Sequence, residues 1–389
     1  MEIDWKSVQR VLVVRLRSIG DTVLATPSLI ALKRFLPNAR VDILLEDWVA
    51  PLLDEFDSVD NVIIAGKTTL ERLATIREIR KRKYDVVFNL HGGTTSIFFT
   101  FASGATHRVG HSGYRYSFLH NHHLSSASDF WKQEHTHSAE QQLALLGCVG
   151  VPVDDRPRSR LAVTNEALES LEKKFNARTQ SRKEITGRNV SVNEHAPMQK
   201  PARSKGETRK NEHADSAFRI PHLHSAFALL HPTAAFATKQ WSTENFAQVA
   251  EYLAENGIKS IAVASKNEQD ILDKLESISK VQIITFDDLS LPEITALASK
   301  ARLFVGNDSG IAHIAAAVNT PTVVIFGSSN RHHWYPWTYA PNEMVFEPLP
   351  CQPCPGYECK EFGDPKCILS VRPENVFAAI DRVITKTTF

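Results

Sequence analysis

The chain has 389 residues, of which 42% are hydrophobic and 23% charged, and its formal net charge is +1. This length favours two domains with separate cores, and the balanced charge gives no electrostatic reason to expect nucleic-acid binding. No apolar run reaches the roughly 18 residues of a membrane span, and the first residues, MEIDWKSVQR, lack an apolar signal core. The sequence therefore predicts a cytoplasmic protein of ordinary composition.

Short apolar runs alternate with amphipathic stretches in the first half of the chain. We expect strands at 11–16, 41–45, 59–65 and 84–90, and helices at 21–35, 48–55 and 68–82. Pro27 lies inside the first of these helices and is expected to bend it. Because strands alternate with helices, we predict a parallel, doubly wound sheet and assign residues 1–170 to an N-terminal Rossmann-like domain.

A polar segment interrupts this pattern. Residues 176–224 contain ten Lys or Arg residues, five Asp or Glu residues and few large apolar side chains. Such a composition cannot offset the entropy of an ordered chain, so we expect a disordered basic insertion next to the interdomain linker. A basic tract that contacts anionic lipid or a partner is the alternative.

The alternation returns in the second half. We expect strands at 226–231, 258–265, 281–286, 301–307 and 321–327, helices at 243–256, 267–279 and 292–300, and a closing helix at 372–385. We therefore predict a C-terminal Rossmann-like domain at 225–371 and a closing helical segment at 372–389. Two domains of this α/β class hold a ligand between them, at the carboxyl ends of their strands.

The first polar segment after a strand is RLRSIGD, residues 15–21. It matches neither the G-x-G-x-x-G dinucleotide pattern nor the Walker pattern. Asp21 is therefore a candidate catalytic base, and capping of the following helix is the alternative role.

The second is HPTAAFATKQW, residues 231–241, in which Thr233 offers a hydroxyl and Lys239 a mobile cation. A phosphate could be held by Lys239 and neighbouring backbone N–H groups, and a solvated loop lysine is the alternative.

The third is VGNDSGIAHIAAA, residues 305–317, where a strand runs into an alanine-rich helix. The small residues Ser309 and Gly310 allow a ligand to approach the backbone, and the helix N-terminus favours a phosphate. Asp308 could instead be a simple cap and His313 a packed side chain, but the run of small residues favours a ligand site.

Four of the five cysteines crowd into CQPCPGYECKEFGDPKC, residues 351–367. Cys351, Cys354, Cys359 and Cys367 could supply four thiolates to a structural zinc ion, since this spacing suggests metal before disulfide in a reducing compartment. Reduced cysteines packed in a loop are the alternative.

Taken together, four segments resemble glycosyltransferase family nine, the lipopolysaccharide heptosyltransferases. They are SIGDTVLATPSLIALK, YDVVFNLHGG, HPTAAFATKQW and GNDSGIAHIAAA. The cysteine cluster is similar to one in some heptosyltransferases of the second type. The resemblance implies an α/β GT-B fold, in which two Rossmann-like domains face a central cleft, with the acceptor in the N-terminal domain and the nucleotide-sugar donor in the C-terminal one.

The resemblance also implies residue roles for an inverting transfer of heptose from ADP-heptose to the lipopolysaccharide inner core. Asp21 would be the general base, and Arg15 and Arg17 would face anionic groups of the acceptor. The donor would contact Thr233, Lys239, Asp308, Ser309, Gly310 and His313. No D-x-D pair is placed for a divalent ion, so we expect no obligatory metal in catalysis.

The implied acceptor places the enzyme at the inner face of the membrane, where it could be peripheral. The sequence indicates no oligomeric state. Two alternatives stay open: a related transferase that uses another nucleotide sugar for a surface polysaccharide, and a nucleotide-sugar-binding protein that has lost catalysis.

Overall fold

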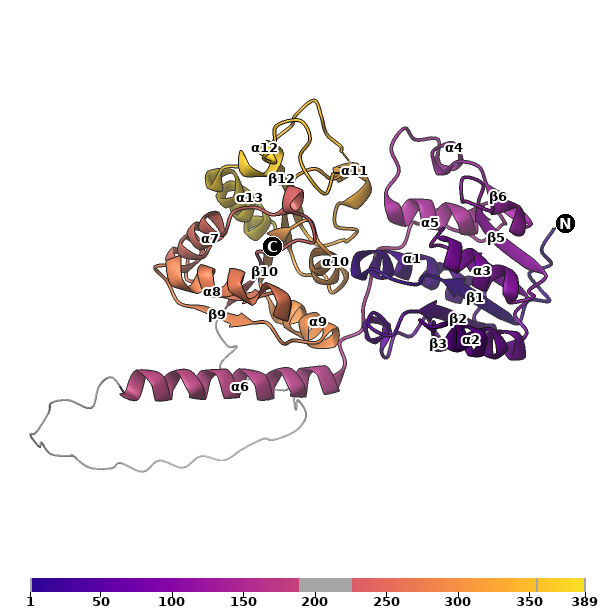
Figure 1. Ribbon diagram of the computed structural model, residues 1–389, viewed down its shortest axis with the longest axis horizontal. Coiled ribbons are helices and arrows are strands. Elements are labelled where there is room, and N and C mark those ends of the chain that lie inside the picture. Colours follow the sequence, from indigo (N-terminus) through magenta and orange to yellow (C-terminus); the bar gives the residue numbers. More distant parts are fainter. Residues whose placement is uncertain (1, 189–225, 355, 388–389) are drawn as a thin grey trace, which may run out of the picture.

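A computed structural model describes residues 2–188, 226–354 and 356–387, with the side chains of residues 179–188 left undescribed. The described residues form two six-stranded sheets in which neighbouring strands are parallel (Figure 1). The predicted architecture of two doubly wound α/β domains is therefore confirmed. Most of the predicted insertion at 176–224 lies outside the described residues.

The first sheet has the order β3-β2-β1-β4-β5-β6. Its strands are β1 (Arg10–Val14), β2 (Arg40–Leu45), β3 (Asn61–Ile64), β4 (Val86–Asn89), β5 (His107–His111) and β6 (His122–Leu124). Its helices are α1 (Ile19–Phe35), η1 (Ala50–Leu53), α2 (Thr69–Arg82), α3 (Thr94–Ala102), η2 (Ser117–Leu119), α4 (Ala127–Trp131) and α5 (Ser138–Gly147). The sequence did not predict β5, β6 or α3, and the helix expected at 48–55 is the short 3-10 helix η1.

The second sheet has the order β12-β11-β10-β7-β8-β9, which repeats the winding of the first. Its strands are β7 (Phe227–His231), β8 (Lys259–Val263), β9 (Ile283–Phe286), β10 (Leu303–Asn307), β11 (Thr322–Phe326) and β12 (Asn342–Phe346). Its helices are η3 (Ala237–Lys239), α7 (Thr243–Glu255), η4 (Lys266–Glu268), α8 (Gln269–Ile278), α9 (Leu291–Lys300), α10 (Gly310–Ala317), α11 (Arg331–Trp334), α12 (Lys366–Leu369) and α13 (Pro373–Lys386).

Alternate side chains of β1 point to opposite faces of the first sheet. Val11 and Val13 pack in the core that contains α1 and α5 and continues into the second domain. Leu12 and Val14 pack on the other face, where α2 and α3 contribute buried side chains. One face of the N-terminal domain is thus turned toward the second domain, and the α2–α3 face is turned away from it.

Helix α1 continues through Pro27 without a break. A proline removes the N–H that would bond the carbonyl four residues earlier, here that of Val23. The Thr26 hydroxyl donates to this carbonyl at 2.7 Å and replaces the lost bond. The Val23 carbonyl therefore keeps a hydrogen-bond partner without the bend that we expected at Pro27.

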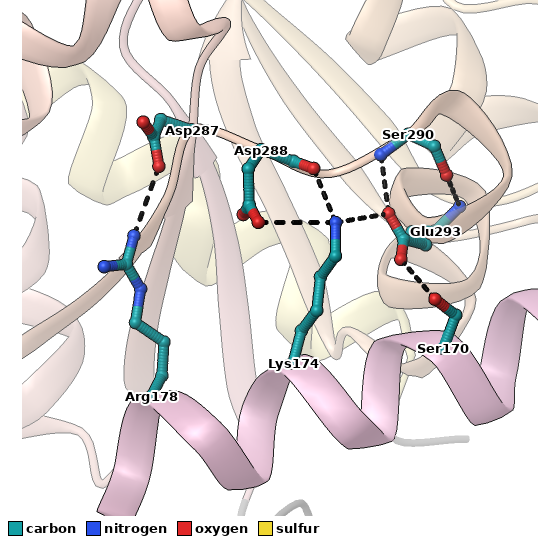
Figure 2. A network of polar contacts seen from close by, with 7 residues as sticks. All are labelled: Ser170, Lys174, Arg178, Asp287, Asp288, Ser290 and Glu293. Carbon is teal, nitrogen blue, oxygen red and sulfur yellow. Dashed lines mark hydrogen bonds and ion pairs between the residues drawn. The ribbon is translucent and has the colours of Figure 1, made fainter. Parts of the chain in front are cut away.

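Helix α6 (Asn165–Arg188) follows the first sheet in the chain, and the predicted boundary at 170 falls inside it. Figure 2 shows its side chains meeting the loop between β9 and α9. Lys174 Nζ lies 3.0 Å from Glu293 Oε2, and Ser170 donates to Glu293 Oε1 at 2.7 Å. Arg178 pairs with Asp287 at 3.2 Å. Hydrogen bonds and ion pairs therefore hold helix α6 against the second domain.

Glu293 is the buried centre of this network and also closes the capping box of α9 with Ser290. Burial by itself would raise the pKa of its carboxyl, but bonds from Ser170, the Ser290 backbone and Lys174 together bring that pKa below its usual value.

Within the described part of the chain, no helix is both long enough and apolar enough to cross a membrane.

Candidate active site

The strand order reverses between the first and fourth strands of each sheet, at β1 and β4 and at β7 and β10. Ligands of doubly wound folds bind beyond the carboxyl ends of strands at such points. Asp21 follows β1, His91 follows β4, Thr233 follows β7 and Asp308 follows β10. The fold therefore brings these four positions, distant in sequence, to one place.

A cleft of about 730 Å³ lies at this place and is lined by both domains. Among the predicted site residues, it is lined by Arg17, Asp21, Thr233, Lys239, Asp308, Ser309, Gly310 and His313. Arg15 does not line it: its side chain is only 8% exposed and is paired with Asp21.

The N-termini of α1 and α10 meet across this cleft. A Cβ atom on Gly20 would lie 2.8 Å from Cδ2 of His313, and one on Gly310 would lie 2.6 Å from Cβ of Ile19. Both distances are too short for real carbon atoms, so each position requires glycine while the two helices stay this close. Two helix N-termini with their unpaired N–H groups favour an anion between them.

Arg15 and Asp21 form an ion pair, and Arg15 also donates to the carbonyl of Leu90. These contacts tie the carboxylate of Asp21 to the end of β4. Thr22 N–H bonds the Ser18 carbonyl as the first turn of α1 forms, and Ser18 makes no side-chain cap. The side chain of Asp21 is 22% exposed, and Asp21 lines the cleft, where a ligand can reach it.

Lys239 Nζ lies 2.8 Å from Asp308 Oδ2, and the hydroxyl of Ser329 donates to the same oxygen. The preceding residue, Asn307, accepts from Trp241 N–H at 3.1 Å and donates to the Pro232 carbonyl at 3.0 Å. The loop that carries Lys239 is therefore joined to the end of β10 by side-chain bonds on both sides.

Three histidines line the cleft: His231 and His313 are buried and His91 is half-buried. Burial lowers the pKa of each ring. The pKa falls to about 4 for His91, where Arg15 adds to the effect, and to about 4 for His231. It is also lowered for His313. All three rings are therefore neutral near pH 7. Nδ1 of His91 and Nδ1 of His313 have no partner among the described residues.

The structure adds cleft residues to which sequence reasoning gave no role: Trp48, His91, His231, Glu268 and Trp334. His91 comes two residues after β4 and His231 ends β7, so strand order would have identified them. Glu268 follows β8, and its carboxylate accepts from the Ser265 backbone at 3.0 Å. Trp48 comes from a turn and Trp334 from the end of α11, and neither segment carries a motif.

The four clustered cysteines line a separate hollow of about 500 Å³, together with Thr238 and Ser328. Cys367 is buried, and burial, followed by its neighbours Cys354 and Cys351, raises the pKa of its thiol. Across the described ranges, no three or more His, Cys, Asp or Glu side chains converge as metal ligands. In this structure the four thiols line the same hollow but are not arranged as a set of metal ligands.

The cysteine segment supports the loop of Lys239. Thr238 donates to the Gly356 carbonyl at 2.6 Å and accepts from the Ser328 hydroxyl at 2.9 Å. Cys354 N–H bonds the Ser328 carbonyl at 3.0 Å. The loop is thus held from behind by the segment that contains the cysteines.

Comparisons with known proteins identify the family and the fold of this chain. The family model described as glycosyltransferase family 9 (heptosyltransferase) matches residues 72–363. Lipopolysaccharide heptosyltransferase 3 of Escherichia coli is 27% identical over 386 residues, covering 96% of this chain and 98% of the relative. Lipooligosaccharide heptosyltransferase 2 of Campylobacter jejuni is 30% identical over 161 residues, covering 40% of this chain and 51% of the relative.

Solved structures show the same fold at low identity. The family 9 glycosyl transferase of Veillonella parvula has a TM-score of 0.72 at 16% identity and covers 100% of this chain and 99% of that one. The ADP-heptose lipopolysaccharide heptosyltransferase II of E. coli has a TM-score of 0.71 at 18% identity, covering 97% and 99%.

Proposed function

Because the chain belongs to glycosyltransferase family 9 and has the GT-B fold of a glycosyltransferase, we propose that it transfers a heptose from ADP-heptose to the inner core of lipopolysaccharide, inverting the anomeric carbon. Relatives named as lipopolysaccharide heptosyltransferases support the sugar and the acceptor. A solved E. coli heptosyltransferase, WaaC, with a TM-score of 0.64, was determined with ADP, which supports the donor.

One observation carries the proposal: a carboxylate side chain of the N-terminal domain and a lysine of the C-terminal domain line the same interdomain cleft. Asp21 comes from the first domain, whereas Lys239 and Asp308 come from the second. An inverting transfer needs a base on the acceptor side and cationic or dipolar groups on the leaving diphosphate. The cleft contains a carboxylate from one domain and a lysine from the other, which supports the proposal.

In the proposed reaction, the Asp21 carboxylate accepts the proton of an acceptor hydroxyl. The hydroxyl oxygen then bonds to the anomeric carbon as the bond from that carbon to the ADP oxygen breaks. The electron pair of the broken bond leaves with ADP, whose charge is stabilised by Lys239 and the N-terminus of α10. Arg15 is a positioning residue, because it contacts Asp21 and is too buried to reach the acceptor.

The remaining cleft residues divide between donor and acceptor. We assign Thr233, Ser309, Gly310 and neutral His313 to the donor, and Arg17 to anionic groups of the acceptor. Glu268 lies after the second strand of its domain, where an acidic residue binds ribose hydroxyls in dinucleotide-binding folds. We therefore place the nucleoside of the donor beside β8.

The test is to incubate the protein with ADP-heptose and heptose-deficient lipopolysaccharide and to measure ADP release. We expect release that depends on both substrates. Turnover of another nucleotide sugar instead would identify a related transferase. Tight ADP-heptose binding by calorimetry with no release would identify a protein that has lost catalysis, and either result would overturn the proposal.

A further inference from the structure

The outward face of the N-terminal domain carries a cluster of exposed large apolar side chains. They come from α2, α3, the residue before η2 and η2 itself. We call them the α2–α3 patch: Leu70, Leu73, Phe98, Phe101, Tyr116 and Phe118. Leu70 is 80% exposed and Phe118 is 76% exposed. Of thirteen large apolar side chains exposed in the described residues, these six share one region. Such clustering marks an interaction site.

The members of the patch are connected through neighbouring side chains. Leu73 of α2 and Phe98 of α3 line one shallow hollow with Arg72. The guanidinium of Arg108 lies 5.9 Å from the Phe101 ring and donates to the Leu119 carbonyl at 2.9 Å, which joins α3 to η2. The rings of Tyr116 and Phe118 lie 6.2 Å apart. The patch is thus continuous from α2 to η2.

The core does not use these side chains. Ile79 of α2 and Phe99 of α3 point inward and are fully buried, whereas Phe98 and Phe101 point outward from the same helix. This face is also the one turned away from the second domain. Figure 1 shows both helices on the N-terminal domain.

Basic residues surround the apolar ones. Residues 67–83 contain seven Lys or Arg and two Glu, an excess of five positive charges. Arg82 pairs with Asp42 and Glu78, and Lys67 pairs with Asp47. Arg72, Arg77, Arg80 and Lys81 form no ion pair with the described part of the chain. Their charge is available to an anionic partner.

We propose that the α2–α3 patch docks the enzyme on an anionic lipid surface. Apolar side chains insert at the headgroup boundary, and the negative surface potential of the membrane attracts the surrounding arginines and lysines. This inference rests on the proposed function, in which the acceptor is lipid-borne. Helix α3 starts just after His91, which lines the cleft, so docking here places the cleft near the lipid-anchored acceptor.

The test uses the full chain and vesicle co-sedimentation. Wild type is compared on vesicles of phosphatidylethanolamine with phosphatidylglycerol and on vesicles of phosphatidylcholine alone. We expect binding to the anionic vesicles that weakens with salt, because a screened field falls off within a Debye length. The double variant Leu70→Ser/Phe118→Ser is expected to bind at least about tenfold more weakly.

The matched control is Leu369→Ser/Tyr339→Ser, which removes exposed apolar side chains of the second domain. It should bind vesicles like wild type, and circular dichroism should show both double variants folded. Equal vesicle binding by the two double variants would overturn the proposal. So would a patch variant that binds vesicles normally but loses self-association in light scattering, because the occupant would then be a second copy.

Turnover of a delipidated core acceptor separates this inference from the proposed function. We expect the patch variant to keep wild-type turnover on this acceptor and to lose turnover on acceptor embedded in vesicles. Failure of wild type to use the delipidated acceptor would contradict the transferase proposal and leave the vesicle-binding result to decide the docking site. Equal loss on both acceptors would overturn the docking site.

Discussion

Lys239 Nζ lies 2.8 Å from Asp308 Oδ2, although 69 residues separate them in the chain. Both line the interdomain cleft, and Asp308 comes two residues before α10 begins. The carboxylate therefore holds the ammonium beside a helix N-terminus, the two kinds of group that stabilise a leaving diphosphate. This ion pair with Asp308 fixes the position of a lysine side chain that would otherwise be mobile on its loop.

Replacing this lysine tests its role on the donor. We expect Lys239→Met to weaken ADP binding and to raise the KM for ADP-heptose about 10- to 100-fold, because a hydrogen bond to a charged group contributes roughly 1.5–3 kcal/mol. Calorimetry with ADP and steady-state kinetics measure the two quantities. The exposed Lys259→Met serves as control, and an unchanged affinity in Lys239→Met would remove Lys239 from the donor site.

His137 links the two domains and predicts a pH dependence of stability. Its Nδ1 accepts from Ala139 N–H at 3.1 Å, so Nε2 carries the proton and donates to the Tyr335 carbonyl at 2.8 Å. Burial lowers the pKa of this ring from 6.5 to about 3. Between these values the unfolded chain binds the proton and the folded one does not. The stability that this lowered pKa contributes to the folded state is complete above pH 6.5 and is lost as the pH falls toward 3.

Each pH unit in that window should cost up to about 1.4 kcal/mol through this one group. We expect His137→Gln to be less stable near neutral pH and to have a shallower decline in the free energy of unfolding on acidification. Urea unfolding between about pH 5 and pH 7.5 measures both. His135→Gln, two residues away and exposed, should follow wild type. Equal slopes for His137→Gln and wild type would contradict this assignment.

The contact between α6 and Glu293 is predicted to stabilise the wall of the interdomain cleft, where we propose that the donor binds. Leu291 and Ile294 at the start of α9 line the cleft, and Glu293 between them is bonded by Lys174. We expect Lys174→Met to lower the free energy of unfolding by about 1–2 kcal/mol, since the lysine is partly exposed and its partner is a buried carboxylate. Chemical denaturation measures this change.

Lys173→Met, on the neighbouring exposed position of the same helix, is the control for that prediction. It should leave stability unchanged. A loss in Lys173→Met as large as that in Lys174→Met would attribute the effect to the helix rather than to the contact with Glu293.

The cysteine cluster is the subject of a metal prediction. We propose that Cys351, Cys354, Cys359 and Cys367 take up zinc, which would require their thiols to move together and lose their protons. Elemental analysis of purified protein should find stoichiometric zinc, and Cys351→Ser/Cys354→Ser should lose it. Cys148→Ser, in the first domain, is the control. Protein that stays metal-free when purified with added zinc would support the reduced-loop alternative.

The sequence predicted the two sheets because their strands are continuous apolar runs, which are typical of strands covered on both faces. It missed α3, whose sequence TTSIFFTFA places Phe98 and Phe101 outside and Phe99 inside, so that the apolar pattern indicates no single buried face. It also missed β12, whose side chains are mostly half-buried.

The cleft was predictable to the extent that its residues follow strands. Asp21 and Asp308 each come shortly after a strand at a reversal point, and the resemblance to a family supplied their expected roles. The burial of Arg15 was not predictable, because its side chain bonds the Leu90 carbonyl, 75 residues away and just beyond the end of β4. The contact of His137 with Tyr335 spans 198 residues and has no local signal in the sequence.

The central claim is that Asp21 removes the acceptor proton, and Asp21→Asn tests it most directly. ADP release from ADP-heptose with heptose-deficient lipopolysaccharide is measured beside ADP affinity, with the exposed Asp129→Asn as control. We predict that turnover by Asp21→Asn falls at least about 100-fold, the usual contribution of a general base, while ADP affinity stays near that of wild type. Turnover by Asp21→Asn close to that of wild type would contradict the account.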